Sequence, residues 1–133
     1  MQRFNNKNFL EIYRFIIVGI FSVFIDFLFY YLFIYFEILD PNNAKRVSFI
    51  AGATFAFYAN RKYVFKVDER KFSQYVMFSF LYFISFVLNS IVHDYIFLIS
   101  KLILIAFLSA TLVSTVINFL GQKFIIFKNN DYE

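Results

Sequence analysis

The 133-residue sequence contains no cysteine and only one histidine, His93. The absence of cysteine excludes disulfide bonds, thiolate metal sites and a cysteine nucleophile. A single histidine cannot build the usual zinc or non-haem iron ligand sets, so we expect neither a metal nor a cofactor. The motifs of serine hydrolases, phosphate-binding loops and zinc proteases are also missing. We therefore predict that the chain is not an enzyme.

Charge is scarce as well, since charged residues make up 17% of the chain and hydrophobic residues 61%. Mean hydropathy is +0.65. A soluble domain of this length has too little interior to bury so much apolar surface, because small domains have a high ratio of surface to volume. The composition excludes a soluble globular protein and predicts one all-α integral membrane domain over residues 1–133.

The hydrophobic residues fall into four stretches, which we predict to be transmembrane helices. The second stretch is short. It spans a bilayer only if Lys45 and Arg46 extend their charged groups to one interface and the helix continues through residues 62–65. The four predicted spans cover residues 12–36, 47–59, 75–99 and 102–119.

Positive charge is distributed unevenly along the chain. All 13 Lys and Arg residues except Lys45, Arg46 and Lys101 lie near the N-terminus, in the connection 61–73 or in the C-terminal tail. The positive-inside rule predicts that both termini and this connection face the cytoplasm. The net charge of +4 then reflects topology and attraction to anionic lipids, and we expect no nucleic-acid partner.

An internal repeat relates the two halves of the chain. Residues 57–66 align with residues 119–128, and the offset of 62 also pairs two series of small or amide side chains. Each series steps by four residues, which places its members on one helix face that a neighbouring helix can approach closely. We predict two repeated two-helix halves, residues 9–66 and 71–128, related by an axis along the membrane normal. The paired residues are Ser48, Gly52, Ala56 and Asn60 with Ala110, Ser114, Asn118 and Gln122.

Three polar side chains are expected at depth in the predicted spans. An ionised Asp26 carboxylate in the membrane interior costs free energy, so we expect this side chain to be protonated, paired with a cation or facing a water-filled cavity. It is either a coupling or gating site, or a neutral acid hydrogen-bonded to a neighbouring helix. Asn89 and Asn118 either line a polar path or bond between helices. His93 and its neighbour Asp94 are expected at the outer interface, in a structural role.

Cations and amides gather where the predicted spans reach the cytoplasm. Arginine presents a planar fork of donors that suits phosphate, and lysine supplies a point charge. The alternative is that these cations only anchor the topology. With the polar residues at depth they form our candidate substrate-binding set, which comprises Arg14, Asp26, Asn60, Arg61, Lys62, Asn89, Asn118, Gln122 and Lys123.

Two motifs resemble those of a known family. Residues 14–19 (RFIIVG), followed by Asp26, are similar to the opening motif of the GtrA-like membrane proteins, and residues 60–65 (NRKYVF) resemble the family's N-R-x-x-V-F signature. A weaker copy lies at residues 122–127, where Gln122 and Lys123 replace a common Asn-Arg pair. Ala56 stands where the family often has Asn.

This resemblance implies a small four-span protein that works beside polyprenyl-phosphate glycosyltransferases. Such proteins are thought to move lipid-linked sugars across the bacterial cytoplasmic membrane for cell-surface polysaccharide or teichoic-acid glycosylation. We therefore predict a multi-pass inner-membrane flippase whose partners are a polyprenyl-phosphate-linked sugar and membrane glycosyltransferases. Four helices alone are few to surround a complete transport path, which favours a homo-oligomer.

Two other classes of function stay open. One is a small-solute exporter that uses Asp26 for proton exchange, and the other is a non-transporting membrane subunit that docks or stabilises a glycosyltransferase. A neighbouring glycosyltransferase gene would favour the flippase or the subunit, whereas a drug-resistance phenotype would favour the exporter.

Overall fold

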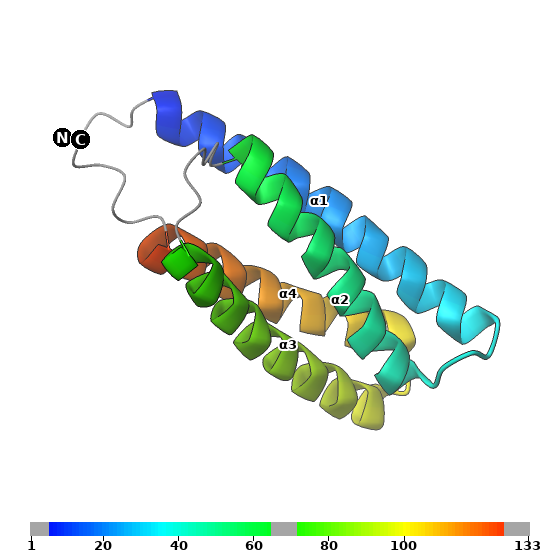
Figure 1. Cartoon of the computed structure of the whole chain (residues 1–133). Helices are drawn as coiled ribbons and strands as arrows, with labels where there is room; N and C mark the ends of the chain where they lie inside the picture. The colour runs from blue at the N-terminus through cyan, green and yellow to red at the C-terminus, as the bar shows by residue number, and fades with distance from the viewer. Residues whose placement is uncertain (1–5, 65–71, 127–133) are drawn as a thin grey trace.

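The computed structural model describes residues 6–64 and 72–126, and in this part of the chain all regular structure is helical (Figure 1). The long helices are α1 (Asn6–Tyr35), α2 (Pro41–Ala59), α3 (Phe72–Ser100) and α4 (Ile103–Gly121). Helix α2 continues into a π-helix, η1 (Asn60–Val64), and α4 continues into a second π-helix, η2 (Gln122–Ile126). The predicted all-α architecture with four long helices is confirmed.

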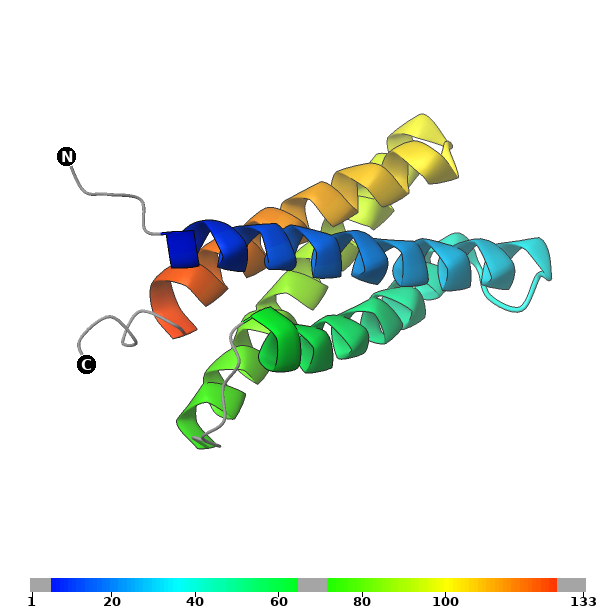
Figure 2. The same cartoon turned by 90° about the horizontal axis from the view of Figure 1, so that it is seen from above.

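The helices are arranged as two hairpins. Helix α1 packs along α2, and α3 packs along α4, while the two hairpins contact each other less extensively (Figures 1 and 2). Helices α1 and α3 run in the same direction, so both tight turns, at residues 36–40 and 101–102, lie at one end of the bundle. We call this the turn end, and the opposite end, which carries η1 and η2, the π end.

Three of the four helices are long and apolar enough to cross a membrane. Their apolar segments are Phe9–Tyr35, Tyr75–Ser100 and Ile103–Gly121. Helix α2 does not reach that standard, because its 19 residues include Lys45, Arg46 and other polar side chains, which lower its hydropathy. It lies in the same bundle as the three apolar helices, and its own crossing of the bilayer stays a prediction.

The second helices of the two hairpins, and the π-helices that follow them, are separated by the same offset of 62 residues that relates the two halves of the sequence. Helices α2 and α4 both contain 19 residues, and each is followed by a five-residue π-helix. The backbone N–H of Asn60 bonds the carbonyls of Ala56 and Phe57. In the same way, Gln122 bonds the carbonyls of Asn118 and Phe119. The continuations that we expected beyond both predicted spans are therefore present, but they are wound as π-helices.

The predicted small stripe of α2 faces the interior. Its four residues, Ser48, Gly52, Ala56 and Asn60, are all buried. A Cβ atom added to Gly52 would lie 2.8 Å from the carbonyl oxygen of Ser22 and 3.0 Å from Cβ of Asp26. Such close backbone approach is what small residues permit between helices in lipid. The stripe therefore sets the distance between α1 and α2, and brings the polar residues of α2 against Asp26.

Candidate functional site

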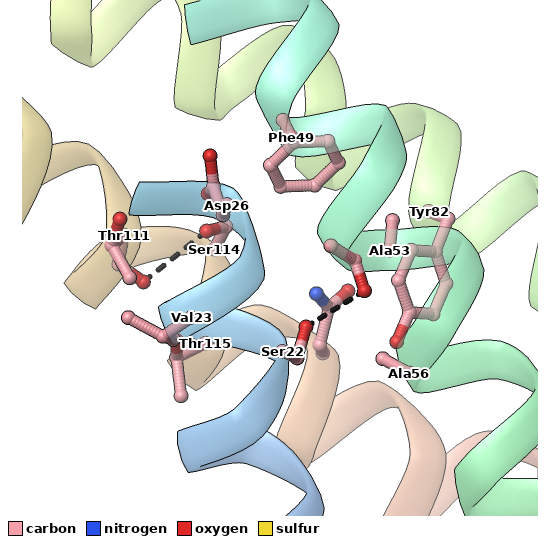
Figure 3. Close-up of a pocket in the computed structure, with 12 residues that line it drawn as sticks. Ser22, Val23, Asp26, Phe49, Ala53, Ala56, Tyr82, Thr111, Ser114 and Thr115 are labelled. Atoms are coloured by element: carbon pink, nitrogen blue, oxygen red, sulfur yellow. Dashed lines mark hydrogen bonds between the residues drawn. The ribbon is translucent and has the colours of Figure 1, made fainter. Parts of the chain in front are cut away.

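A small cavity lies in the middle of the bundle, between the two hairpins. Its lining side chains include Ser22 and Asp26 from α1, Tyr82 from α3, and Ser114 and Asn118 from α4 (Figure 3). The cavity measures about 50 Å³. One water needs roughly 10–15 Å³ on this scale, so the space admits a few water molecules. A sugar phosphate does not fit, and the hairpins are closed in this conformation.

Asp26 forms an ion pair at the wall of this cavity. The Lys45 ammonium donates to Asp26 Oδ2 at 2.5 Å, and the Ser48 hydroxyl donates to Oδ1 at 2.6 Å. The Lys45 side chain is 0% exposed, and its ammonium lies 4.3 Å from the centre of the Phe107 ring. Of the states expected for Asp26, the structure shows the paired one.

Our expectation for Lys45 was wrong. We expected this cation to extend toward the interface, but it points inward and is fully buried. The physical reason is the Asp26 carboxylate, which faces α2 across the Gly52 contact. A buried ammonium is tolerated when a carboxylate and an aromatic face surround it.

Two further hydrogen bonds join α3 to α4 near the cavity. Asn89 Nδ2 donates to Ser114 Oγ at 2.9 Å, and the Ser85 hydroxyl donates to Asn118 Oδ1. Both predicted asparagines therefore bond between helices. Asn89 Oδ1 is buried and has no hydrogen-bond partner among the described residues. A buried amide oxygen without a donor is uncommon and indicates that a donor from outside the chain can bind there.

The repeat-related amides meet at the π end. Asn60 Nδ2 lies 3.4 Å from Gln122 Oε1, and Gln122 Nε2 lies 3.4 Å from the Tyr82 hydroxyl. Asn60 and Gln122 are 3% and 1% exposed. Within the part of the chain that the structure describes, Asn60 Oδ1 has no partner either. π-Helical turns occur frequently at functional sites, and here both of them begin at these two amides.

Three of the predicted cations surround this end with different exposures. The Arg61 guanidinium stacks on the Tyr75 ring of α3, with 5.0 Å between Cζ and the ring centre. Lys62 is exposed beside the Tyr63 ring, and Arg14 is half-buried in α1. Lys123 lies in η2, but its side chain is outside the described part of the structure. The contact of Arg61 with Tyr75 therefore joins the first hairpin to α3 at the π end.

A second polar cluster joins the hairpins at the turn end. Tyr30 Oη and His93 Nε2 are 2.8 Å apart, and the Arg46 guanidinium donates to Asp94 Oδ2. His93 Nδ1 lies 3.5 Å from Asp94 Oδ1. The His93 side chain is 0% exposed and lies inside the bundle, and its expected position at the depth of the outer interface stays a prediction. The Tyr30 hydroxyl supplies the polar partner that allows a histidine to lie inside the bundle.

Several residues of these clusters were not among our candidates, including Tyr30, Lys45, Arg46, His93 and Asp94. The sequence offered one usable signal, which is that Asp26 interrupts an apolar stretch and needs an opposite charge, while Lys45 lies just before the next apolar stretch. Tyr30 and His93 carry no such signal, because a tyrosine or a histidine is common near interfaces.

Comparison with known proteins shows the family of the chain. A family model described as "GtrA/DPMS, transmembrane domain" matches residues 14–127, a region that contains Asp26, both π-helices and the whole cavity. No curated protein and no solved structure is significantly similar to the chain. With three helices able to cross a membrane, the chain is a multi-pass membrane protein. It belongs to the GtrA/DPMS transmembrane-domain family.

Proposed function

We propose that the protein moves a polyprenyl-phosphate-linked sugar across the bacterial cytoplasmic membrane. The observation that carries the proposal is a row of buried polar side chains along the contact between the hairpins. Polar and ionisable groups inside a membrane are expensive and often mark a substrate path. Family membership supports a role in polyprenyl-phosphate sugar metabolism. The buried members of the row are Asn60, Gln122, Asn89, Asp26 and Lys45, and Asn118 lies among them half-buried.

The chemistry of this row suits the two polar parts of such a lipid. Arg61 and Lys62, with Arg14 and Lys123, offer charges for the phosphate at the π end. The unpartnered amide oxygens of Asn60 and Asn89 are acceptors, and sugar hydroxyls are donors. The prenyl chain stays in the lipid outside the bundle. The proposal assigns no bond-making step to this chain.

The proposal places the π end on the cytoplasmic side. Reporter fusions at residue 1, within the connection 61–73 and after Lys128 are expected to read cytoplasmic, and a fusion at Asn43 external, because of the positive-inside rule. The fusion at Asn43 tests α2 in particular, because an internal reading there would mean that α1 and α2 do not cross as a hairpin. An external reading for 61–73 would overturn the orientation.

Reconstitution into liposomes tests the function. Purified protein is inserted into vesicles that contain a short-chain polyprenyl-phosphate sugar in both leaflets, and a membrane-impermeant reagent modifies the sugar from outside. Without transport only the outer-leaflet pool reacts. With the protein we expect the inner pool to become reactive as well, while a phospholipid reporter with a different headgroup stays protected. Equal protection of the inner pool with and without protein would contradict the proposal.

A substitution of Arg61 distinguishes between two roles for this residue, which are phosphate binding and anchoring of the topology. Arg61→Lys keeps the charge but removes the planar fork and the flat stacking on Tyr75. We expect this variant to insert normally and to bind the lipid-linked sugar phosphate more weakly, by roughly 1–3 kcal/mol. The measurement is affinity for a short-chain substrate at matched protein amount and fixed salt. Arg70→Lys, in the same connection of the sequence, is the control with unchanged affinity, and an equal affinity for Arg61→Lys would return Arg61 to an anchoring role.

A second candidate is a non-transporting subunit of a membrane glycosyltransferase. The small volume of the cavity, about 50 Å³, favours it, since docking needs no path wide enough for a sugar phosphate. In that case the liposome assay would show no exposure of the inner pool, while addition of the protein would raise the activity of the co-purified glycosyltransferase. A homo-oligomer and anionic lipids around the basic π end are further partners that we propose.

A further inference from the structure

The two hairpins are each held together internally by short polar contacts. In the first hairpin, Ser22 donates to the Gly52 carbonyl at 2.8 Å and Lys45 bonds Asp26. In the second, Asn89 bonds Ser114. Bonds of this length within a hairpin favour its movement as one unit, since separating α1 from α2 would leave Lys45 and Asp26 unpaired in a dry interior.

Contacts between the hairpins differ at the two ends of the bundle. At the π end they are aromatic pairs, such as Phe15 with Phe119 and Phe57 with Phe78, and the long Asn60–Gln122 bond of 3.4 Å. Lipid tails are as apolar as phenylalanine, so such aromatic contacts can be exchanged for lipid without a hydrophobic penalty.

The turn end is joined more strongly. Tyr30 on α1 bonds His93 on α3 at 2.8 Å, and both side chains are almost fully buried. Arg46 on α2 pairs with Asp94, the neighbour of His93. Each of these two contacts crosses from one hairpin to the other, and together they engage both helices of the first hairpin. Separating the hairpins at the turn end leaves the charges of Arg46 and Asp94 without their partners, which costs free energy wherever water is limited.

We propose that Tyr30, His93, Arg46 and Asp94 form a gate at the turn end, which opens when the hairpins separate and lets the sugar phosphate leave the bundle. The inference rests on the proposed function, because it explains how a cavity of about 50 Å³ becomes a path. The Arg46 and Asp94 side chains are 35% and 33% exposed, so the ion pair lies at the boundary between the interior and the aqueous side. The ion pair follows the end of the row that contains Lys45, the residue next to Arg46 in the sequence.

Cross-linking tests the gate in the liposome assay. The chain has no cysteine, so Arg46→Cys/Asp94→Cys carries the only two thiols. The transport rate of this variant before treatment is its own reference, and we expect a loss of at least tenfold from that rate when a short bis-methanethiosulfonate reagent bridges the thiols, and recovery with reductant. Tyr35→Cys/Asn43→Cys joins two exposed positions within the first hairpin and is the matched control, whose rate the reagent should not change.

Charge reversal provides a second test that does not depend on the thiol pair. Arg46→Asp and Asp94→Arg each place like charges together, which keeps the gate from closing. A gate that cannot close stops the cycle of opening and closing, so each variant is expected to lose at least tenfold in transport. Arg46→Asp/Asp94→Arg restores an opposite pair and should recover to within about threefold of the wild type. Thermal unfolding in detergent confirms that each variant is folded.

The outcomes distinguish the gate from the proposed function. If the wild type does not expose the inner pool, the proposed function fails. If the wild type transports, but the bridged pair transports at the same rate or the reversed pair does not recover, the gate is wrong and the proposed function stands.

Discussion

Asp26→Asn is expected to destabilise the protein by about 3–5 kcal/mol, because it leaves the Lys45 ammonium buried without a counter-charge. Lys45 has no exposed surface through which water could compensate the loss. Lys45→Met leaves the Asp26 carboxylate in the same position with only the Ser48 hydroxyl bonded to it. We expect a loss of similar size. The measurement is the free energy of unfolding in detergent or bicelles, with membrane insertion checked separately.

The double variant Asp26→Asn/Lys45→Met separates stability from function. Replacing a buried ion pair by neutral side chains of similar volume is often neutral or stabilising, so the double variant should regain most of the stability that each single variant loses. Transport should stay abolished if the pair acts in the path. Full transport by the stable double variant would show that the pair serves packing alone, and additive destabilisation would show that the two side chains do not interact.

Gly52→Ala is expected to have the next largest effect. The added methyl group would lie 2.8 Å from the Ser22 carbonyl oxygen and 3.0 Å from Cβ of Asp26. The first of these atoms belongs to the backbone of α1, so relief requires α1 and α2 to move apart. The movement strains the Ser22–Gly52 hydrogen bond and the ion pair of Asp26. Overpacking of this kind costs about 1–3 kcal/mol.

Gly19→Ala is the matched control for this prediction. Gly19 also lies inside a helix, α1, but a Cβ atom added there would meet nothing within 4 Å. We expect its melting temperature in detergent to equal or exceed that of the wild type, whereas Gly52→Ala should melt several degrees lower. Equal melting temperatures for the two variants would contradict the close approach of α1 and α2 at Gly52.

The helices and their inward faces could be predicted from the sequence, because both follow from local patterns. Long apolar stretches predict long helices in a membrane. The series from Ser48 to Asn60 repeats every four residues, which places it on one face. The offset of 62 predicted equivalent positions for Asn60 and Gln122, and their side chains do meet.

The partners of the buried polar groups could not be predicted in the same way. Lys45 lies near the start of α2, where a cation ordinarily extends to the interface. Its inward orientation depends on Asp26, which is 19 residues away and on another helix. His93 likewise depends on Tyr30, 63 residues away. Periodicity indicates which face a residue occupies, but not which side chain of a neighbouring helix lies opposite it.

The π-helices also could not be predicted from the sequence. An extra residue in a helical turn produces no hydrophobic period of its own over a five-residue segment. The repeat showed that residues 60–64 and 122–126 are equivalent, and the structure shows what they share, which is the π-turn that begins at the amide. The Asn60 and Gln122 side chains meet where these two π-turns begin.

The most direct test of the account compares the wild type with Asp26→Asn/Lys45→Met, reconstituted at equal density in liposomes that contain a short-chain polyprenyl-phosphate sugar. The quantity measured is the rate at which the inner-leaflet sugar becomes reactive toward an impermeant reagent. The account predicts rapid exposure with the wild type and, with the folded double variant, the rate of protein-free liposomes. Inner-leaflet sugar that stays protected with the wild type would contradict it.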